Sequence, residues 1–174
     1  MPDRSRTYSW YDPLAALEEA AGLSGLDVMR LIVAGQLPQP PIAKTLGFRL
    51  VEIEPGRSVF ECEPAEFHYN PIGTVHAGLA TALLDSAMGC AFASTLEAGM
   101  AWTTLELKAN FTRPLTSETG TVRCSGSVLH PGRTIGTTEA RIEDADGRLR
   151  AHGTSTILVL GPNDRGVDGS VGER

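Results

Sequence analysis

The sequence predicts an α+β fold in which an antiparallel β-sheet wraps around one long central helix, with an extra helix on the N-terminal side. Three observations predict it. One long apolar helical stretch lies in mid-chain, extended segments of alternating character flank it, and Pro-Gly or Asp-Gly pairs separate neighbouring segments. Tight turns favour antiparallel pairing of strands, and a lone helix must then cover one face of the sheet.

The composition is that of one folded domain. Of 174 residues, 41% are hydrophobic and 21% charged, and the formal net charge is −6. This apolar content suffices for a core, whereas nucleic-acid binding needs clustered Lys and Arg that the chain lacks. Cys62, Cys90 and Cys124 have neither metal-site spacing nor the even count of a disulfide framework. Together with a polar chain start, they predict a cytoplasmic location and no metal.

The chain divides into three predicted parts. Residues 1–37 hold a polar tail and a helix, residues 38–161 form the main domain, and residues 162–174 form a flexible tail rich in Gly and charge. Asp12 and Pro13 are residue types that begin helices.

The N-terminal helix is predicted to be interrupted around residues 22–25 and to end near Gly35. A cluster of prolines follows. Because proline lacks a backbone donor and restricts the residue before it, this cluster predicts a linker without regular structure. The prolines are Pro38, Pro40 and Pro41.

Six strands are predicted in the main domain, two before the central helix and four after it, with the last four joined by tight turns. The turn pairs begin at Pro55, Pro131 and Asp146. Trp102 and Phe111, near the ends of the third segment, are interpreted as packing residues. The extended segments lie at residues 48–54, 58–63, 103–111, 121–130, 133–144 and 149–160.

The central helix is predicted from His76 to Leu96, and between His76 and Glu97 the only ionisable side chain apart from Cys90 is Asp85. Apolar residues occupy most of its circumference, which indicates a buried helix. An unpaired polar group in such a place costs roughly 2–7 kcal/mol. Asp85 is therefore either a satisfied core residue or a catalytic base or nucleophile facing a cleft, and the helix alone does not separate these interpretations.

The segment before this helix favours catalysis. Gly73 permits a sharp turn, and the first helical amides, those of Ala77 and Gly78, are expected to be free donors supported by the helix dipole. A thioester oxygen that gains negative charge needs such donors. Asp85 and an amide at the helix start would then bracket one reacting carbonyl.

Two motifs resemble those of the hotdog-fold acyl-CoA thioesterases. They are N-P-x-G-T-V-H-A-G-x-x-x-x-L-L-D-x-A-x-G, from Asn70, and T-x-E-L-K-x-N-F-x-R-P, from Thr104. The most similar branch is the phenylacetate-degradation type, akin to the 4-hydroxybenzoyl-CoA thioesterases. The resemblance covers residues 40–160 and implies the hotdog fold, in which an antiparallel sheet encloses one helix.

The resemblance implies a role for each motif residue. Asp85 matches the catalytic carboxylate, and Asn70 matches the polar residue that orients the thioester or the attacking water. Ala77 stands where the family usually has a glycine whose amide polarises the carbonyl. Thr104 matches the residue that holds the water when counted back from Arg113, although counting forward from Asp85 points to Thr103.

Further candidates bind substrate. His76 and Gly78 belong to the helix-start motif, and His76 is expected to be structural, bonding a neighbouring loop, with a direct catalytic role as the alternative. Arg113 and Arg133 are candidates for the CoA phosphates, since guanidinium groups match phosphate geometry, or else are solvated surface residues.

The implied reaction is hydrolysis of an acyl-CoA to free acid and CoA, without a metal or other cofactor; CoA enters as part of the substrate. The family forms dimers or dimers of dimers, with Asp85 of one chain facing the partner subunit's Asn70 and Ala77. Whether Asp85 acts as base or nucleophile stays open. The identity of the acyl group and the role of the N-terminal helix also stay open.

Two other functions remain as alternatives. A hotdog hydratase or dehydratase usually pairs a carboxylate with a nearby His, and residues 86–90 contain none. A non-catalytic acyl-CoA sensor that binds DNA would need a basic added segment, and the N-terminal helix is short and acidic. A pure acyl-CoA-binding protein is the form of this alternative that the sequence permits.

Overall fold

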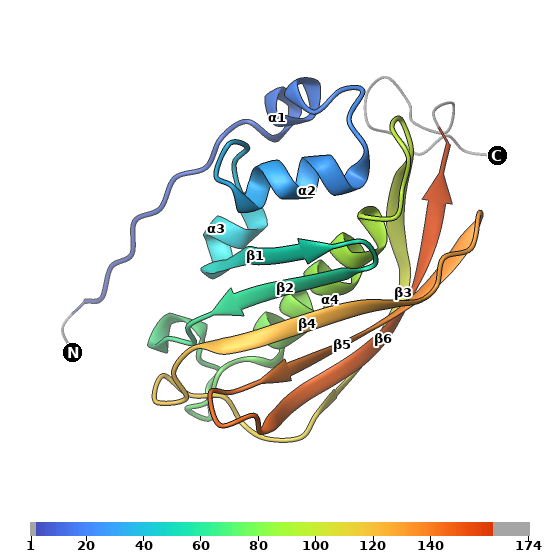
Figure 1. The fold of residues 1–174 in the computed structure, drawn as a ribbon. Helices are drawn as coiled ribbons and strands as arrows, with labels where there is room; N and C mark the ends of the chain where they lie inside the picture. Colours follow the sequence, from blue (N-terminus) through green and yellow to red (C-terminus); the bar gives the residue numbers. More distant parts are fainter. Residues whose placement is uncertain (1–2, 162–174) are drawn as a thin grey trace.

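A curved antiparallel sheet of six strands wraps around helix α4 in the computed structural model, which describes residues 3–161 (Figure 1). The strand order is β1-β2-β4-β5-β6-β3. The predicted fold class is thereby confirmed, whereas the tail predicted at residues 162–174 lies outside the described part. The strands are β1 Phe48–Glu54, β2 Arg57–Cys62, β3 Ala101–Phe111, β4 Val122–His130, β5 Ile135–Glu143 and β6 Leu149–Leu160.

One predicted connection is wrong. Three hairpins form as expected, β1–β2, β4–β5 and β5–β6, but β3 and β4 are not joined by a tight turn. The chain instead crosses between them through residues 112–121, and β3 pairs antiparallel with β6 at the far edge of the sheet. Within residues 3–161, β6 is the only strand paired with β3, so its outer edge is open.

Helix α4, Ala77–Ala93, forms the centre of the hydrophobic core. Ten of its residues are buried, and Leu84, Ala87 and Met88 have no exposed surface. The sheet approaches the helix backbone closely where β4 carries Gly126, since a Cβ there would lie 2.4 Å from the Ala87 carbonyl oxygen. The hydroxyl of Ser58 donates to the same oxygen at 2.7 Å. This close fit fixes the position of α4 along the strands.

Three short helices precede the sheet, α1 Pro13–Glu19 and α2 Gly25–Val33 in the N-terminal part and α3 Pro41–Leu46 at the start of the main domain. The interruption predicted around residues 22–25 separates α1 from α2. The prediction of an irregular linker at the prolines is wrong in part, because Pro41 occupies the first position of α3, where its missing N–H costs nothing. Met29 of α2 is buried in the core, whereas α1 buries no residue.

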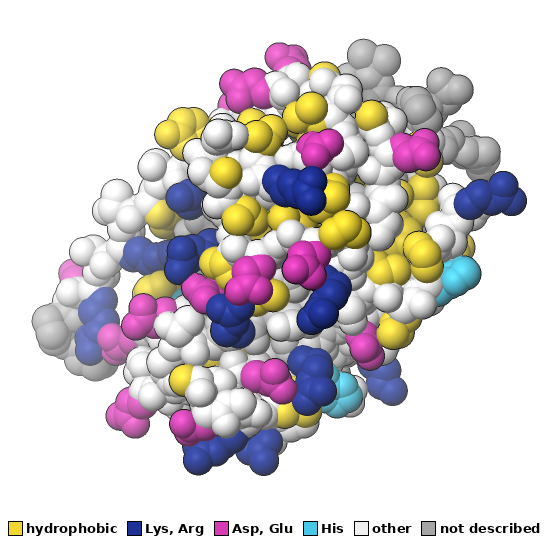
Figure 2. Space-filling model, viewed as in Figure 1, with side chains coloured by type: hydrophobic (Ala, Val, Ile, Leu, Met, Phe, Trp, Pro, Cys, Tyr) yellow, Lys and Arg dark blue, Asp and Glu magenta, His cyan; other side chains and the backbone are white. Residues whose placement is uncertain are grey.

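The outer face of strands β1, β2 and β4 carries acidic and basic side chains side by side (Figure 2). Glu61 pairs with Arg49 and with Arg123, and Arg123 also pairs with Glu52. These opposite charges alternate, so this face forms no basic patch. Among the helices of residues 3–161, none has both the length and the apolar character to span a bilayer.

Candidate active site

Asp85 and Thr104 lie in direct contact between the central helix and the edge strand. Thr104 Oγ1 donates to Asp85 Oδ1 at 2.8 Å. Both residues are half-buried, whereas Thr103 is exposed, because neighbouring residues of a strand point to opposite faces. The structure thus places Thr104, and not Thr103, beside the carboxylate. Asp85 is a partly accessible group with one hydroxyl donor.

Cys90 lies near this carboxylate but is not a candidate nucleophile. Burial, and to a smaller extent the charge of Asp85, raises the pKa of its thiol to about 12. Because only the thiolate attacks carbonyl groups effectively, a thiol that stays protonated at neutral pH contributes little.

His76 caps helix α4. Its Nδ1 accepts the backbone N–H of Gly78 at 2.8 Å, so its partner is the first helical turn and not the neighbouring loop that was expected. The expectation that Gly78 offers a free donor is therefore wrong. A Cβ at Gly78 would lie 2.8 Å from this Nδ1, which explains why glycine stands there.

Ala77 offers a backbone donor at the start of α4. Its N–H makes no hydrogen bond within residues 3–161. None of the described non-glycine residues has a positive φ, so alanine here is unstrained, and a glycine is not required for the backbone. The substitution of Ala for the usual glycine therefore leaves a helix-start amide aimed outward.

Replacing His76 with Ala is expected to lower the free energy of unfolding by about 1 kcal/mol, since the Gly78 N–H loses its acceptor. Thermal or urea unfolding measures this loss. His76→Asn is the control, because asparagine caps helices well and should retain most of the stability. Equal stability of His76→Ala and wild type would show that the cap contributes nothing.

Asn70 organises the turn that leads into the helix. Its Oδ1 accepts the N–H groups of Ile72 and Thr74, and its Nδ2 donates to Thr74 Oγ1 at 3.0 Å. Gly73 completes the turn with φ +81°. One Nδ2 hydrogen remains available for a ligand.

A cavity of about 300 Å³ lies beside the helix start. Phe111, which is 49% exposed, lines it, so the interpretation of this residue as packing is wrong, whereas Trp102 does pack against the core. The cavity is lined by segments 74–77 and 111–115 together with Asn70, Ala80, Arg150 and Ala151.

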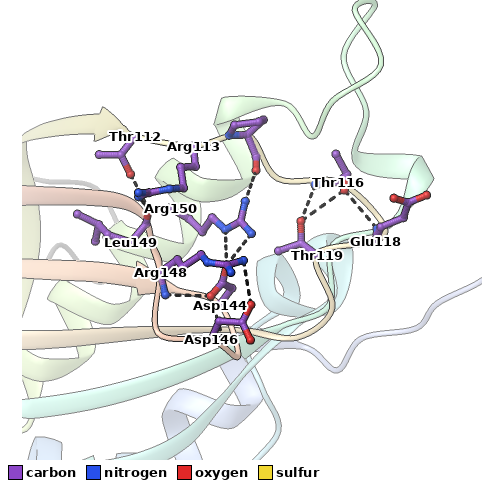
Figure 3. Close-up of polar contacts among 11 residues, drawn as sticks. Thr112, Arg113, Thr116, Glu118, Thr119, Asp144, Asp146, Arg148, Leu149 and Arg150 are labelled. Carbon is purple, nitrogen blue, oxygen red and sulfur yellow. Dashed lines mark hydrogen bonds and ion pairs between the residues drawn. The ribbon is translucent and has the colours of Figure 1, made fainter.

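Arg150 is a lining residue that sequence reasoning missed. Its Nε and Nη2 contact Asp144 Oδ2 at 2.8 and 2.6 Å, and its Nη1 donates to the Pro114 carbonyl at 2.8 Å (Figure 3). The Arg148 backbone N–H, and then the Arg150 guanidinium, hold the pKa of Asp144 below its usual range. Asp144 is thus ionised at neutral pH and fixes Arg150.

The two arginines expected to bind phosphate lie at opposite ends of the sheet. Arg113 lines the cavity and donates to the Leu149 carbonyl at 2.8 Å. Arg133 lies in the β4–β5 turn, beside the other end of β6, and is exposed. In the part of the chain that the structure describes, His, Cys, Asp and Glu form no group that could hold a metal ion.

Within one chain, Asp85 and Ala77 do not meet. They are eight positions apart on the helix, which is about 12 Å along the axis. Asp85 does not line the cavity that includes Ala77 and Asn70. Within one chain, the Asp85 carboxylate and the Ala77 amide are therefore too far apart to contact the same carbonyl group.

Comparison with known proteins gives consistent matches. Residues 72–151 match the model of the Thioesterase superfamily. The chain is 33% identical over 119 residues to a protein of Saccharolobus solfataricus named as an esterase, covering 68% of this chain and 83% of that protein. Human acyl-coenzyme A thioesterase 13 is 31% identical to this chain over 108 residues, which cover 62% of this chain and 76% of the human protein.

A solved structure of a phenylacetic acid degradation-related protein from Ralstonia eutropha JMP134 is similar in fold and sequence. It superposes with a TM-score of 0.68 at 27% identity, covering 75% of this chain and 98% of that one.

Proposed function

The chain belongs to the thioesterase superfamily, and we propose that it hydrolyses an acyl-CoA thioester with Asp85 as its central catalytic group. The observation that carries the proposal is the hydrogen bond from Thr104 to the half-buried Asp85. A carboxylate held by one hydroxyl and partly open to solvent can still accept a proton from water or attack a carbonyl.

In the proposed reaction, the thioester carbonyl accepts a hydrogen bond from the Ala77 N–H. As the carbonyl carbon is attacked, this amide and the helix dipole stabilise the negative charge on oxygen. While Thr104 donates to Asp85, its oxygen can still accept a hydrogen bond from water. Asp85 either deprotonates that water as the water attacks the carbonyl, or attacks the carbonyl itself to form a mixed anhydride. In both routes the tetrahedral intermediate collapses with cleavage of the C–S bond, and CoA leaves as the thiolate, which takes up a proton. In the second route water then hydrolyses the anhydride and restores the carboxylate.

The proposed site lies between two chains. The separation of Asp85 from Ala77 along α4 supports a site in which the two groups come from different subunits. The open edge of β3 supports this arrangement, because an 11-residue unpaired edge is a template for another strand. Antiparallel pairing of two such edges would bring the Thr104 end of one chain beside the partner subunit's Ala77.

Thiol release from a panel of alkyl- and aryl-CoA thioesters tests the proposal. Turnover with release of free CoA supports hydrolysis. Hydration of an enoyl-CoA without thiol release would instead indicate a hydratase. Tight acyl-CoA binding in calorimetry, without any turnover, would indicate a sensor. Either of these last results would overturn the proposed function.

A Thr104→Val variant is expected to lose about 10- to 100-fold in kcat, because a hydrogen bond to a charged group is removed. Thr103→Val is the matched control, since its side chain is exposed on the other face of the same strand. Steady-state kinetics on the best acyl-CoA measure both. Equal losses in the two variants would show that Thr104 acts only through strand structure.

A further inference from the structure

The cavity beside the helix start is basic although the protein is acidic. Its charged lining side chains are Arg113 and Arg150, and no described residue with a carboxylate lines it. The first-turn amide of Ala77 opens on the same space. An anionic group is the ligand that such a lining favours.

Arg150 is built into the cavity wall. Its side chain is 16% exposed and that of Asp144 is 4% exposed, so the pair is largely removed from water. Each of the three guanidinium nitrogens makes one contact, two with Asp144 and one with the Pro114 carbonyl. Because a guanidinium carries five N–H groups, two remain on an oriented, immobile side chain.

The size of the cavity indicates which part of a substrate enters it. A volume of about 300 Å³ corresponds to a sphere roughly 8 Å across. In CoA, the sulfur and the nearest phosphate are separated by about 15 Å of extended chain at ordinary bond lengths. With the carbonyl at Ala77, the phosphates at the end of an extended pantetheine chain would lie outside the cavity, which leaves the acyl arm or the part of the pantetheine next to the sulfur to face its arginines. That part of the pantetheine carries no charge, so only an acyl arm can bring an anionic group to them.

Resting on the proposed function, we infer that this cavity selects acyl groups that carry a carboxylate a few bonds from the thioester, with Arg150 as the specificity-determining residue. The two remaining N–H groups of Arg150 bind the carboxylate, and Arg113 adds positive charge at the rim. Asp144 holds the guanidinium in place in the absence of substrate, so little ordering accompanies binding. The substrate class is the CoA half-thioester of a short dicarboxylic acid.

The test compares kcat/KM for glutaryl-CoA and adipyl-CoA with that for hexanoyl-CoA. Wild type is expected to prefer the carboxylated substrates at least tenfold. Arg150→Gln is expected to lower kcat/KM for the carboxylated substrates by about 10- to 100-fold, while kcat/KM for hexanoyl-CoA changes by less than about threefold. The Arg150→Lys variant keeps the charge, so its kcat/KM for the carboxylated substrates should lie between those of wild type and Arg150→Gln. Arg148→Gln is the matched control, since Arg148 is exposed and does not line the cavity.

Distinct results would overturn the inference. Equal loss on carboxylated and neutral substrates in both Arg150 variants would mean that Arg150 only braces the loop at Pro114. If the Arg150 substitutions no longer lower kcat/KM with acyl-pantetheine thioesters, which lack the nucleotide phosphates, Arg150 would bind CoA instead of the acyl group. Efficient wild-type hydrolysis of hexanoyl-CoA without preference for a carboxylate would refute the selectivity and leave the proposed function intact.

Discussion

An Asp85→Asn variant is expected to lose at least about a thousandfold in kcat with every acyl-CoA that the wild type hydrolyses. Asparagine has nearly the same shape but neither the basicity nor the nucleophilicity of a carboxylate. Its Oδ1 can still accept the hydrogen bond from Thr104, so the local geometry is preserved. Thiol release in steady state and in a single turnover measures the loss.

The control is stability. Since Asp85 is only half-buried and keeps its hydroxyl partner as asparagine, the unfolding midpoint and the oligomeric state should stay close to those of wild type. A folded variant that retains more than a tenth of wild-type turnover would assign Asp85 to the structure of the helix. That outcome would also mean that other residues carry out catalysis.

The central helix and its carboxylate could be predicted because their signals are local. An apolar run of helical length marks α4, and one acidic residue interrupts it, so both follow from neighbouring residues. The three hairpins are equally local, since Pro-Gly and Asp-Gly pairs specify turns. These elements form most of the fold and place Asp85 correctly.

The position of β3 could not be predicted in the same way. Its sequence alternates like that of any half-buried strand, and nothing within residues 101–111 states which neighbour it pairs with. The choice of β6 depends on how the chain crosses α4, which is a property of the whole sheet. We propose that a second chain docks on the open edge of β3, so the way in which two chains would complete the site could not be predicted from the sequence either.

Arg150 and the His76 cap were missed for a related reason. Arg150 becomes part of the cavity wall only because the β5–β6 turn brings Asp144 to it and the segment after β3 brings Pro114. Histidine is also an unusual helix cap, so the sequence suggested a loop contact for His76. An Asp six residues before an Arg, across a tight turn, is a signal that could have indicated the Asp144–Arg150 pair.

Mixing two inactive variants is expected to restore about a quarter of wild-type activity if the site lies between subunits of a symmetric dimer. One variant is Asp85→Asn. The other is Ala77→Pro, which deletes only the amide donor and should cost about 100- to 1000-fold alone. Proline suits the first helical position, and His76 has the extended conformation, φ −61° and ψ 135°, that a following proline requires.

The recovery follows from counting sites. In a mixed dimer, one site joins both altered residues, and the other joins the intact Asp85 of the Ala77→Pro chain with the intact Ala77 of the Asp85→Asn chain. The recovered activity is measured by thiol-release assays after the two variants are co-expressed at equal levels. Ala77→Gly is the control, because it keeps the N–H and its activity should stay near that of wild type. If tagged mixed oligomers form and remain as inactive as either variant, both groups must act within one chain. The helix geometry argues against that result, because α4 would have to bend to bring groups about 12 Å apart onto one carbonyl.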